Sequence, residues 1–162
     1  NVVPPIGRRG MDKDEALKLL KSDVARFNEV RKTNQEPLDL SRSDLKGASL
    51  KGADLRRIDW SGASFQKADL SEAELSGCTL AEADFQGANL QGTNLHHSNL
   101  RKADLRGASF TPFTPRGRIC LNPNSFEGAR WDKAHLEQIL NVLNQNRDWE
   151  IKYQIVPKAK KG

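Results

Sequence analysis

The chain has 162 residues, of which 36% are hydrophobic and 29% charged, and its 26 Lys and Arg exceed its 21 Asp and Glu by five. This length predicts one domain, and no apolar run approaches the roughly 18 residues of a membrane span. Two cysteines exclude a disulfide framework and predict a reduced, intracellular setting.

Residues 1–37 are predicted to form an N-terminal lead and a helical cap. Asp12 and Glu15 have the spacing of a capping box, which marks the start of a helix. One apolar stripe follows at helical spacing, and it consists of Leu17, Leu20, Val24 and Phe27. The helical segment is expected to end near residue 32, with a break around Asp23.

The middle of the chain carries a bulky apolar residue at every fifth position. In an α-helix a step of five scatters such residues around the cylinder, and in a strand an odd step alternates faces. The chain must therefore turn once per five residues. The fifteen bulky residues are the predicted structural core: Leu40, Leu45, Leu50, Leu55, Trp60, Phe65, Leu70, Leu75, Leu80, Phe85, Leu90, Leu95, Leu100, Leu105 and Phe110.

The other positions of each pentapeptide are also regular. The residue two before each bulky one is alanine at nine of the fifteen positions, and Leu38 and Ile58 are the exceptions to its small size. The residue between them is nearly always polar. A small and a large residue separated by one position share a face of an extended backbone, whereas Asx and Gly favour turns. Each pentapeptide therefore predicts one short inward-facing side and one corner.

A side this short favours four sides per coil, so twenty residues would complete one coil. Successive coils would pair as parallel strands do, about 4.8 Å apart, and residues twenty apart would stack. Phe65 and Phe85 would then lie on adjacent coils of one ladder, where aromatic stacking adds to burial.

Three pentapeptides carry a family resemblance. Residues 53–57 read Ala-Asp-Leu-Arg-Arg, residues 68–72 read Ala-Asp-Leu-Ser-Glu and residues 88–92 read Ala-Asn-Leu-Gln-Gly. They resemble the A(D/N)LXX signature of pentapeptide-repeat proteins, and the resemblance covers residues 38–112. It implies an all-β solenoid, namely a right-handed quadrilateral β-helix of about four to five coils. The flanking segments are similar to those of cyanobacterial members of unassigned role.

After residue 112 the five-residue register is lost in a stretch rich in Pro, Gly and Thr, which predicts a loop. Phe113, Arg116 and Arg118 lie in this loop and are the candidate recognition residues, because loops on rigid scaffolds collect binding determinants. Alternatively, the loop only wraps the last coil. The register resumes in a new phase, which predicts an irregular final coil within residues 113–136, at Leu121, Phe126, Trp131 and Leu136.

Residues 137–162 are predicted to form a C-terminal cap of one helix and one strand, followed by a basic tail. The helical period runs from Leu136 to Leu143, and strict alternation follows from Trp149 to Ile155. With both ends covered, the coil edges that would stack on other chains are hidden, which predicts a monomer.

The repeats are close to neutral, because residues 38–112 hold nine Lys and Arg against ten Asp and Glu. The best-known activity that the resemblance implies is modulation of a type II topoisomerase by DNA mimicry, which needs a strongly negative rod. Neutral coils disfavour it. The basic termini could bind nucleic acid weakly, but they lack interleaved aromatic residues and any groove-reading motif. Both functions remain alternatives.

The sequence contains no recognisable catalytic, cofactor-binding or metal-binding constellation. His96 and His97 adjoin on the outward side of one coil without a third ligand at a recognisable spacing, and Cys78 takes a small inward position. The expected function is a non-enzymatic, cytoplasmic scaffold or protein-interaction module with an unidentified protein partner, no cofactor and no membrane insertion. Since the sequence begins at Asn1, it leaves open whether residues 1–10 are native and whether processing directs the protein to another compartment.

Overall fold

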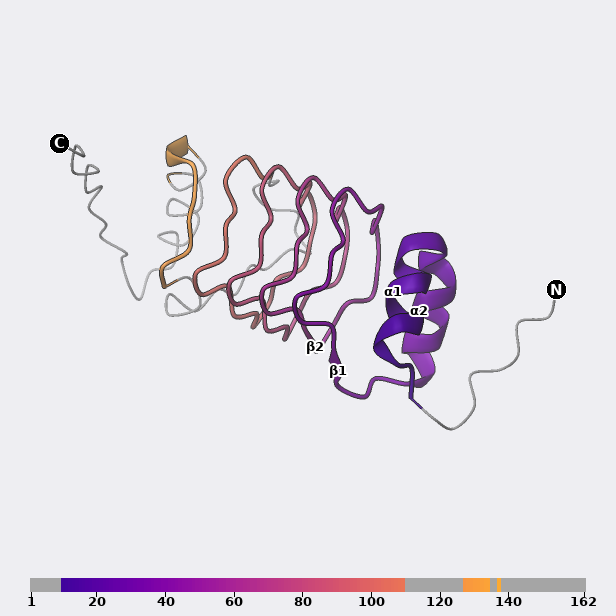
Figure 1. Ribbon diagram of the computed structural model, residues 1–162. Helices are drawn as coiled ribbons and strands as arrows, with labels where there is room; N and C mark the ends of the chain where they lie inside the picture. Colours follow the sequence, from indigo (N-terminus) through magenta and orange to yellow (C-terminus); the bar gives the residue numbers. More distant parts are fainter. Residues whose placement is uncertain (1–9, 110–126, 135–136, 138–162) are drawn as a thin grey trace, which may run out of the picture.

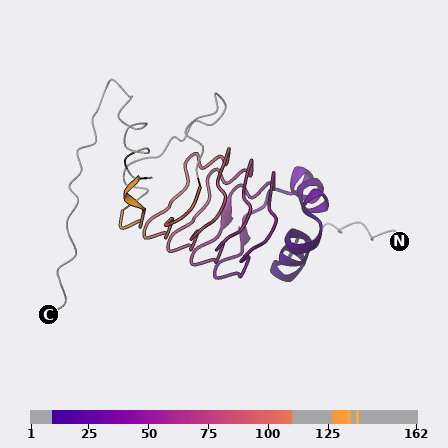
Figure 2. The ribbon, with the colours of Figure 1, turned by 90° about the horizontal axis from the view of Figure 1, so that it is seen from above.

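A computed structural model describes residues 10–109, 127–134 and 137 of the chain. Two helices stand against one end of a stack of coils, and the stack extends away from them toward residue 109 (Figures 1 and 2). The elements in chain order are α1 (Lys13–Ser22), α2 (Val24–Thr33), β1 (Leu38–Asp39) and β2 (Ile58–Asp59).

Aspartates begin both helices. The Asp12 side chain accepts a hydrogen bond from the Glu15 backbone N–H at 2.9 Å, and the Asp23 side chain accepts one from the Arg26 N–H at 2.9 Å. Each bond satisfies a backbone donor that has no partner within the first helical turn. Asp23 also ends α1, with φ −155° and ψ 79°, so the predicted break near this residue is confirmed.

Residues twenty apart pair with one another throughout the coils. The parallel bridges run from Leu38 with Ile58 to Asn89 with Ser109. The backbone N–H of Leu45 donates to Ser64 O at 2.8 Å in the next coil, and similar bonds recur in each pentapeptide from Leu40 to Leu90. This pairing agrees with four five-residue sides per coil, and it gives the short sides the hydrogen-bond partners that each lacks alone.

Nearly every described corner is a turn closed by one backbone hydrogen bond. In the second pentapeptide the Ala48 N–H donates to Leu45 O at 3.0 Å, and Gly47, two residues after the bulky one, has φ +66°. The left-handed region is unfavourable for side chains other than glycine. Seven corners nevertheless hold another residue there, and all seven are charged or histidine: Arg42, Arg57, Lys67, Glu72, Glu82, His97 and Lys102.

The interior of the coils is filled by the bulky residues and the small residues beside them. The fourteen bulky residues from Leu40 to Leu105 are at most 3% exposed, whereas Phe110 lies outside the described residues. The rings of Phe65 and Phe85 stack with centroids 5.1 Å apart at an interplanar angle of 7°, and Trp60 meets Phe65 edge to face at 5.1 Å. The predicted aromatic stacking between adjacent coils is therefore confirmed.

Side chains of the helices bind the open backbone edge of the first coil. The Asn28 side-chain amide donates to Gly52 O at 2.9 Å and accepts from the Asp54 N–H at 2.8 Å. The Lys13 ammonium donates to Ser41 O at 2.6 Å. An unpaired strand edge can template pairing with another chain, so these contacts cover part of that edge.

Arg31 of α2 is the central contact between the helices and the coils. It is 2% exposed, and its guanidinium donates to the backbone oxygens of Arg56 at 2.7 Å, Glu36 at 3.0 Å and Asn34 at 3.4 Å. Burial of the charged group lowers the pKa of Arg31 from its usual value. The arginine therefore joins α2, the connection to β1 and the first coil.

Replacement of Arg31 by alanine is expected to lower the free energy of unfolding by about 2–4 kcal/mol, because it leaves three carbonyl groups without their donor and creates a cavity. Urea denaturation followed by circular dichroism measures this loss. Lys32→Ala is the matched control, since Lys32 is exposed and its ion pair with Glu29 is a surface pair, so it should change stability by less than about 0.5 kcal/mol. Equal stability of the two variants would contradict the role of Arg31.

The hydrogen-bond ladder continues in the second described segment with a changed offset. Asp104 pairs with Arg130, the Leu105 N–H donates to Arg130 O at 2.8 Å, and the Lys102 N–H donates to Glu127 O at 2.9 Å. These partners are 26 or 25 residues apart instead of about twenty, so extra chain lies between them. Trp131 packs against the interior, as its predicted new phase indicates.

Several predicted features lie outside the described residues: the loop with Phe113, Arg116 and Arg118, the positions Leu121, Phe126 and Leu136, and the strand from 149 to 155. Of the predicted C-terminal helix, residues 133, 134 and 137 are described, and they are helical. Among the helices that the structure describes, none has the length and apolar character needed to cross a bilayer.

Candidate functional site

Of the candidate residues that the structure describes, His96 and His97 lie on the outside of the coils and Cys78 lies in the interior. His96 and His97 lie side by side on the outside of the third coil, with ring centroids 3.9 Å apart. In the described segments no three His, Cys, Asp or Glu side chains are arranged to hold a metal ion. Cys78 is buried and its thiol donates to Leu55 O at 2.9 Å. Burial raises the pKa of this thiol to about 12, so it stays protonated and unreactive.

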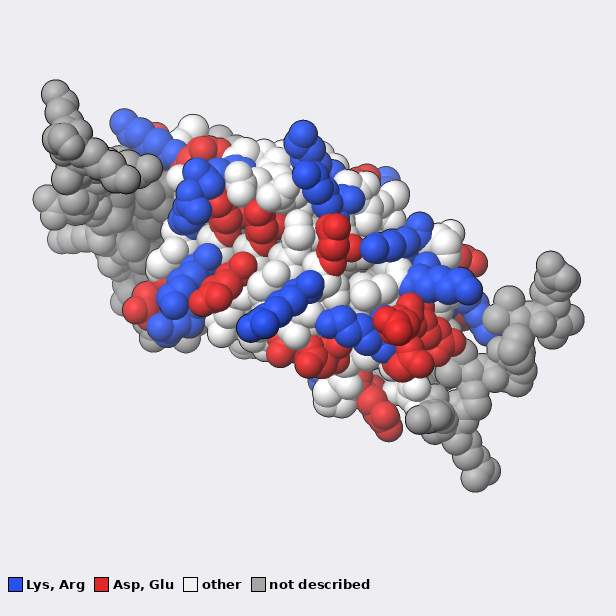
Figure 3. All heavy atoms as spheres, viewed as in Figure 1, with Lys and Arg blue, Asp and Glu red and all other residues white. Residues whose placement is uncertain are grey.

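The outer surface of the coils has four faces, each built of pentapeptides stacked twenty residues apart. Face 1 begins at residues 38, 58, 78 and 98, and faces 2, 3 and 4 begin five, ten and fifteen residues later. Faces 1, 2 and 4 hold equal numbers of basic and acidic residues, and face 3 has one acidic residue more. Figure 3 shows the two signs interspersed along the rod. No face thus resembles a row of phosphates.

Three pairs of acidic residues are stacked in register between consecutive coils. They are Asp39 with Asp59, Asp54 with Glu74, and Asp84 with Asp104. Like charges directly opposite each other in a sheet are destabilising, and neighbouring strands lie only about 4.8 Å apart. Each pair therefore needs a nearby cation or hydrogen-bond donors to offset the repulsion.

The second pair has its cation on the same face. Arg56 follows Asp54 by two residues, and its guanidinium donates to both carboxylate oxygens of Asp54 at 2.7 and 2.6 Å. This hydrogen bonding lowers the pKa of Asp54 and raises the pKa of Arg56. The negative charge of Glu74 also raises the pKa of Arg56. Asn94 donates to Glu74 at 2.8 Å from the next coil. The repulsion between Asp54 and Glu74 is offset within the protein.

The third pair is neutralised even more completely. Arg106 donates to both oxygens of Asp104 at 2.8 and 2.6 Å, and Arg130 lies 3.2 Å from the same carboxylate. Hydrogen bonding from Arg106 is the largest cause of the lowered pKa of Asp104. The Gln66 and Gln86 side-chain amides donate to Asp84 at 2.5 and 3.1 Å. Two arginines and two amides thus offset the charge of this pair.

Asp39 and Asp59 differ from the other two pairs. The positions two residues after them hold Ser41 and Ser61, whose N–H groups each donate at 2.9 Å to one carboxylate oxygen. Hydrogen bonding from Ser41 lowers the pKa of Asp39. Within the described residues, neither carboxylate has a cation within ion-pair distance, and Lys13, which acts electrostatically on Asp39, donates instead to Ser41 O.

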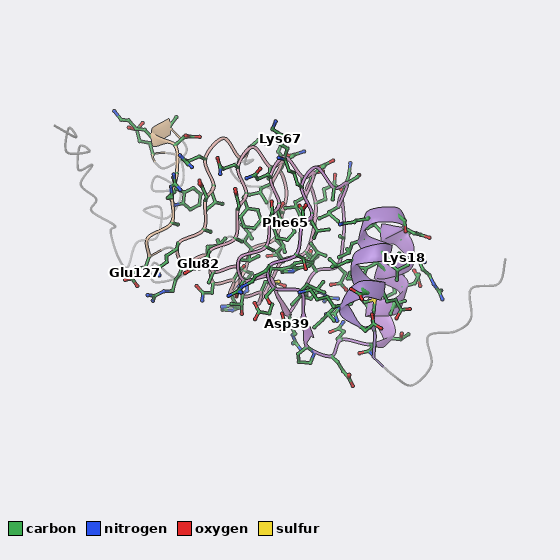
Figure 4. The ribbon with its side chains drawn as sticks, viewed as in Figure 1. Lys18, Asp39, Phe65, Lys67, Glu82 and Glu127 are labelled. Carbon is green, nitrogen blue, oxygen red and sulfur yellow. The ribbon has the colours of Figure 1, made fainter. Side chains whose placement is uncertain are left out.

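A groove of about 300 Å³ lies beside this unneutralised pair. Its apolar side is formed by Pro37, Leu38 and Ile58, and polar groups line the rest: Asp39, Asp59, Thr79, Arg57 and Gly77. In Figure 4, Asp39 lies at the edge of the rod opposite Lys67, with Phe65 in the interior between them. The volume falls at the lower end of the range for ligand pockets.

Gly77 lines the groove beside Arg57. It has φ +68°, and a Cβ atom added there would lie 3.7 Å from Cγ of Arg57 in the preceding coil. The Arg57 stem therefore lies along the glycine, and its guanidinium has no ion pair among the described residues. Arg57 thus adds a basic group to the lining that holds the two carboxylates.

Sequence reasoning did not find this groove, although one signal of it was visible. Leu38 and Ile58 break the rule that the inward position before each bulky residue is small. They pair across β1 and β2, where Ile58 is 1% exposed and Leu38 is only partly buried. A large residue in a small slot on two consecutive coils indicated a local change of shape on face 1.

The model of the pentapeptide-repeat family matches residues 43–80 and 78–111 of the chain. Among solved structures, a pentapeptide repeat protein (Rfr23) from the cyanobacterium Cyanothece 51142 is 34% identical, with 60% of this chain and 63% of that chain covered and a TM-score of 0.50. The pentapeptide repeat protein alr5209 from Nostoc PCC 7120 is 28% identical, with 58% and 72% covered and a TM-score of 0.43.

A third structure is that of AT2G44920, a pentapeptide repeat protein from the Arabidopsis thaliana thylakoid lumen, which is 31% identical with 56% and 59% covered and a TM-score of 0.27. The chain thus spans less than two thirds of the length of the Cyanothece protein. No match was found among the curated proteins.

Proposed function

Because the chain belongs to the pentapeptide-repeat family through residues 43–111, we propose that it is a non-enzymatic module that binds a protein partner through the groove on face 1. Proteins of this family form a right-handed quadrilateral β-helix, whose stacked coils give a rigid support for surface side chains. A groove held on such a support needs little reorganisation on binding, which favours affinity.

The groove is the observation that supports this proposal. It combines a partly exposed apolar side, formed by Pro37 and Leu38, with charged groups of both signs. Elsewhere on the coils several charges are already paired: Lys51, Arg101 and Lys102 form ion pairs with Glu72, Glu127 and Glu82. The groove is where apolar area and unpaired charge coincide.

The two alternatives receive less support from the charge distribution. A DNA mimic needs carboxylates in place of phosphates along a whole face, but every face is within one charge of neutrality. Direct binding of nucleic acid needs free cations, but five of the nine basic residues on the coils form ion pairs. Inhibition of gyrase supercoiling by the protein at micromolar concentration would restore the first alternative.

A capture experiment with a blocked groove tests the proposal. The Thr79→Trp variant places a large ring at the groove, and Gln91→Trp places the same ring on face 3, where residue 91 is exposed. Each immobilised full-length protein is incubated with a lysate of the organism that encodes it. We expect the wild type and Gln91→Trp to retain a common protein that Thr79→Trp loses at least tenfold.

Equal retention by all three proteins would contradict a role for the groove in partner binding. Retention by none of them would contradict the proposed function itself. Circular dichroism melting of each variant checks that the tryptophan has not unfolded the coils, and variants with melting temperatures close to that of the wild type make the comparison valid.

A further inference from the structure

The missing cation beside Asp39 and Asp59 indicates which chemical group would bind in the groove. Asp54 and Glu74 have Arg56, and Asp84 and Asp104 have Arg106 and Arg130 together with glutamine amides. The stacked carboxylates of β1 and β2 have only serine donors. Of the three acidic pairs in the described coils, this one alone lacks a cation within ion-pair distance.

The carboxylates of this pair are accessible. In both Asp39 and Asp59, Oδ1 accepts the serine N–H, and the serine hydroxyl also bonds to the carboxylate. Asp39 is exposed and Asp59 is partly exposed. A donor placed between the two coils could reach an oxygen from each residue, because residues paired in neighbouring strands are about 5 Å apart.

The apolar side of the groove decides which kind of cation fits. A hydrated metal ion gains nothing from contact with Pro37 and Leu38, whereas the methylene groups of Lys or Arg bury favourably along such a surface while the charge stays at its edge. Arg57, which also lines the groove, disfavours a run of basic residues. It favours a single basic residue with an acidic residue beside it, because Arg57 would repel a second basic residue and attract an acidic one.

We propose that the groove binds one Arg or Lys side chain of a protein partner, with its charge between Asp39 and Asp59, its stem on Pro37 and Leu38, and an acidic neighbour facing Arg57. This inference rests on the proposed function and specifies the partner's chemistry. It also explains why the positions two residues after both aspartates hold serine instead of arginine, because an internal arginine would occupy the place of the incoming charge.

The first test uses the free protein and needs no partner. Asn keeps the side-chain oxygen that accepts the Ser61 N–H, so Asp59→Asn removes only the charge. Relief of the repulsion is expected to raise the melting temperature by about 1–4 °C. The matched change Asp104→Asn removes a carboxylate bound by two arginines and should lower the melting temperature. A lower melting temperature for Asp59→Asn would overturn the claim that its charge is unneutralised.

The second test measures binding with two defined peptides. Nuclear magnetic resonance of the isotope-labelled full chain follows titration with acetyl-Ala-Leu-Arg-Glu-Ala-amide and with the same peptide carrying Gln in place of Arg. We expect the arginine peptide to shift the amide signals of Ile58, Asp59 and Thr79 in a saturable way. The glutamine peptide should bind at least tenfold more weakly.

Two variants serve as matched controls in the titration. The double variant Asp39→Asn with Asp59→Asn should weaken binding of the arginine peptide at least tenfold, whereas Asp44→Asn should leave it within twofold. Asp44 lies in the same coil and accepts the N–H two residues on in the same way, but it belongs to face 2. If the double variant binds the arginine peptide as tightly as the wild type does, the proposal is overturned.

The remaining outcomes are also decisive. Equal shifts with both peptides, no shifts with either, or the same shifts with Mg²⁺ or Ca²⁺ alone would contradict an arginine or lysine occupant. If the peptides fail but Thr79→Trp still abolishes partner capture, the groove binds a partner of different chemistry and the proposed function stands. If capture does not depend on Thr79 while the arginine peptide binds, the proposed function fails and the charge preference remains.

Discussion

The Leu80→Asp variant is expected to show no cooperative unfolding transition at neutral pH. Leu80 is fully buried in the third coil, between Trp60 and Leu100 of its ladder. The substitution loses about 2–5 kcal/mol of leucine packing and places a carboxylate in an apolar interior at an effective cost of several kcal/mol more. Together these losses approach the whole stability of a typical domain, about 5–15 kcal/mol.

Urea denaturation followed by far-ultraviolet circular dichroism and by tryptophan fluorescence checks this result. The adjacent change Ala81→Asp is the control, because Ala81 is only partly buried. The equivalent position one coil later holds the exposed and charged Arg101. The control change should alter the free energy of unfolding by no more than about 0.5 kcal/mol. A sharp transition for Leu80→Asp near the wild-type midpoint would show that position 80 does not face the interior.

The Phe65→Ala variant is expected to lose about 3–5 kcal/mol of stability, which is the usual cost of removing a buried phenylalanine. Phe65 contacts aromatic rings on two sides, Trp60 edge to face and Phe85 in a stack. The alanine variant therefore leaves a cavity between two coils and removes both aromatic contacts. Urea denaturation and a double-mutant cycle with Phe85→Ala measure the total loss and the coupling between the rings.

Phe65→Leu is the matched variant, because it keeps most of the volume and gives the position the same residue as Leu45 and Leu105 of its ladder. It should cost less than half as much as the alanine change. A coupling energy near zero between positions 65 and 85 would contradict the stacked arrangement, since contacting residues couple by about 0.5–3 kcal/mol.

The path of the backbone could be predicted from the sequence because the five-residue period reports the turning of the chain directly. The bridges between residues twenty apart and the stack of Phe65 on Phe85 follow from this period. The change of five-residue phase after residue 112 was also visible in the sequence, because Ala129, Arg130 and Trp131 repeat the small-polar-large pattern in a new phase. In the structure, Arg130 pairs with Asp104. Periodicity thus predicts which residues stack.

The contacts of Asn28 and Arg31 with the first coil could not be predicted. They depend on where α2 lies relative to the coil edge, and an amphipathic stripe gives only the buried face of a helix, not its position along that edge. The groove was missed for a related reason. Its charge imbalance appears only when Asp39 and Asp59 are compared with the two other acidic pairs, and the pairing had to be known first.

The change of offset between Asp104 and Arg130 has a consequence for how the chain tolerates variation in length. Six extra residues separate Asp104 from Arg130, yet the backbone hydrogen bonds of Lys102 and Leu105 to the following segment have the same form as those between the earlier coils. Each coil contacts only the next, so a segment added at a corner perturbs one boundary and leaves distant ones untouched. Insertions and deletions can therefore accumulate at corners while the buried ladders stay under strict selection for size.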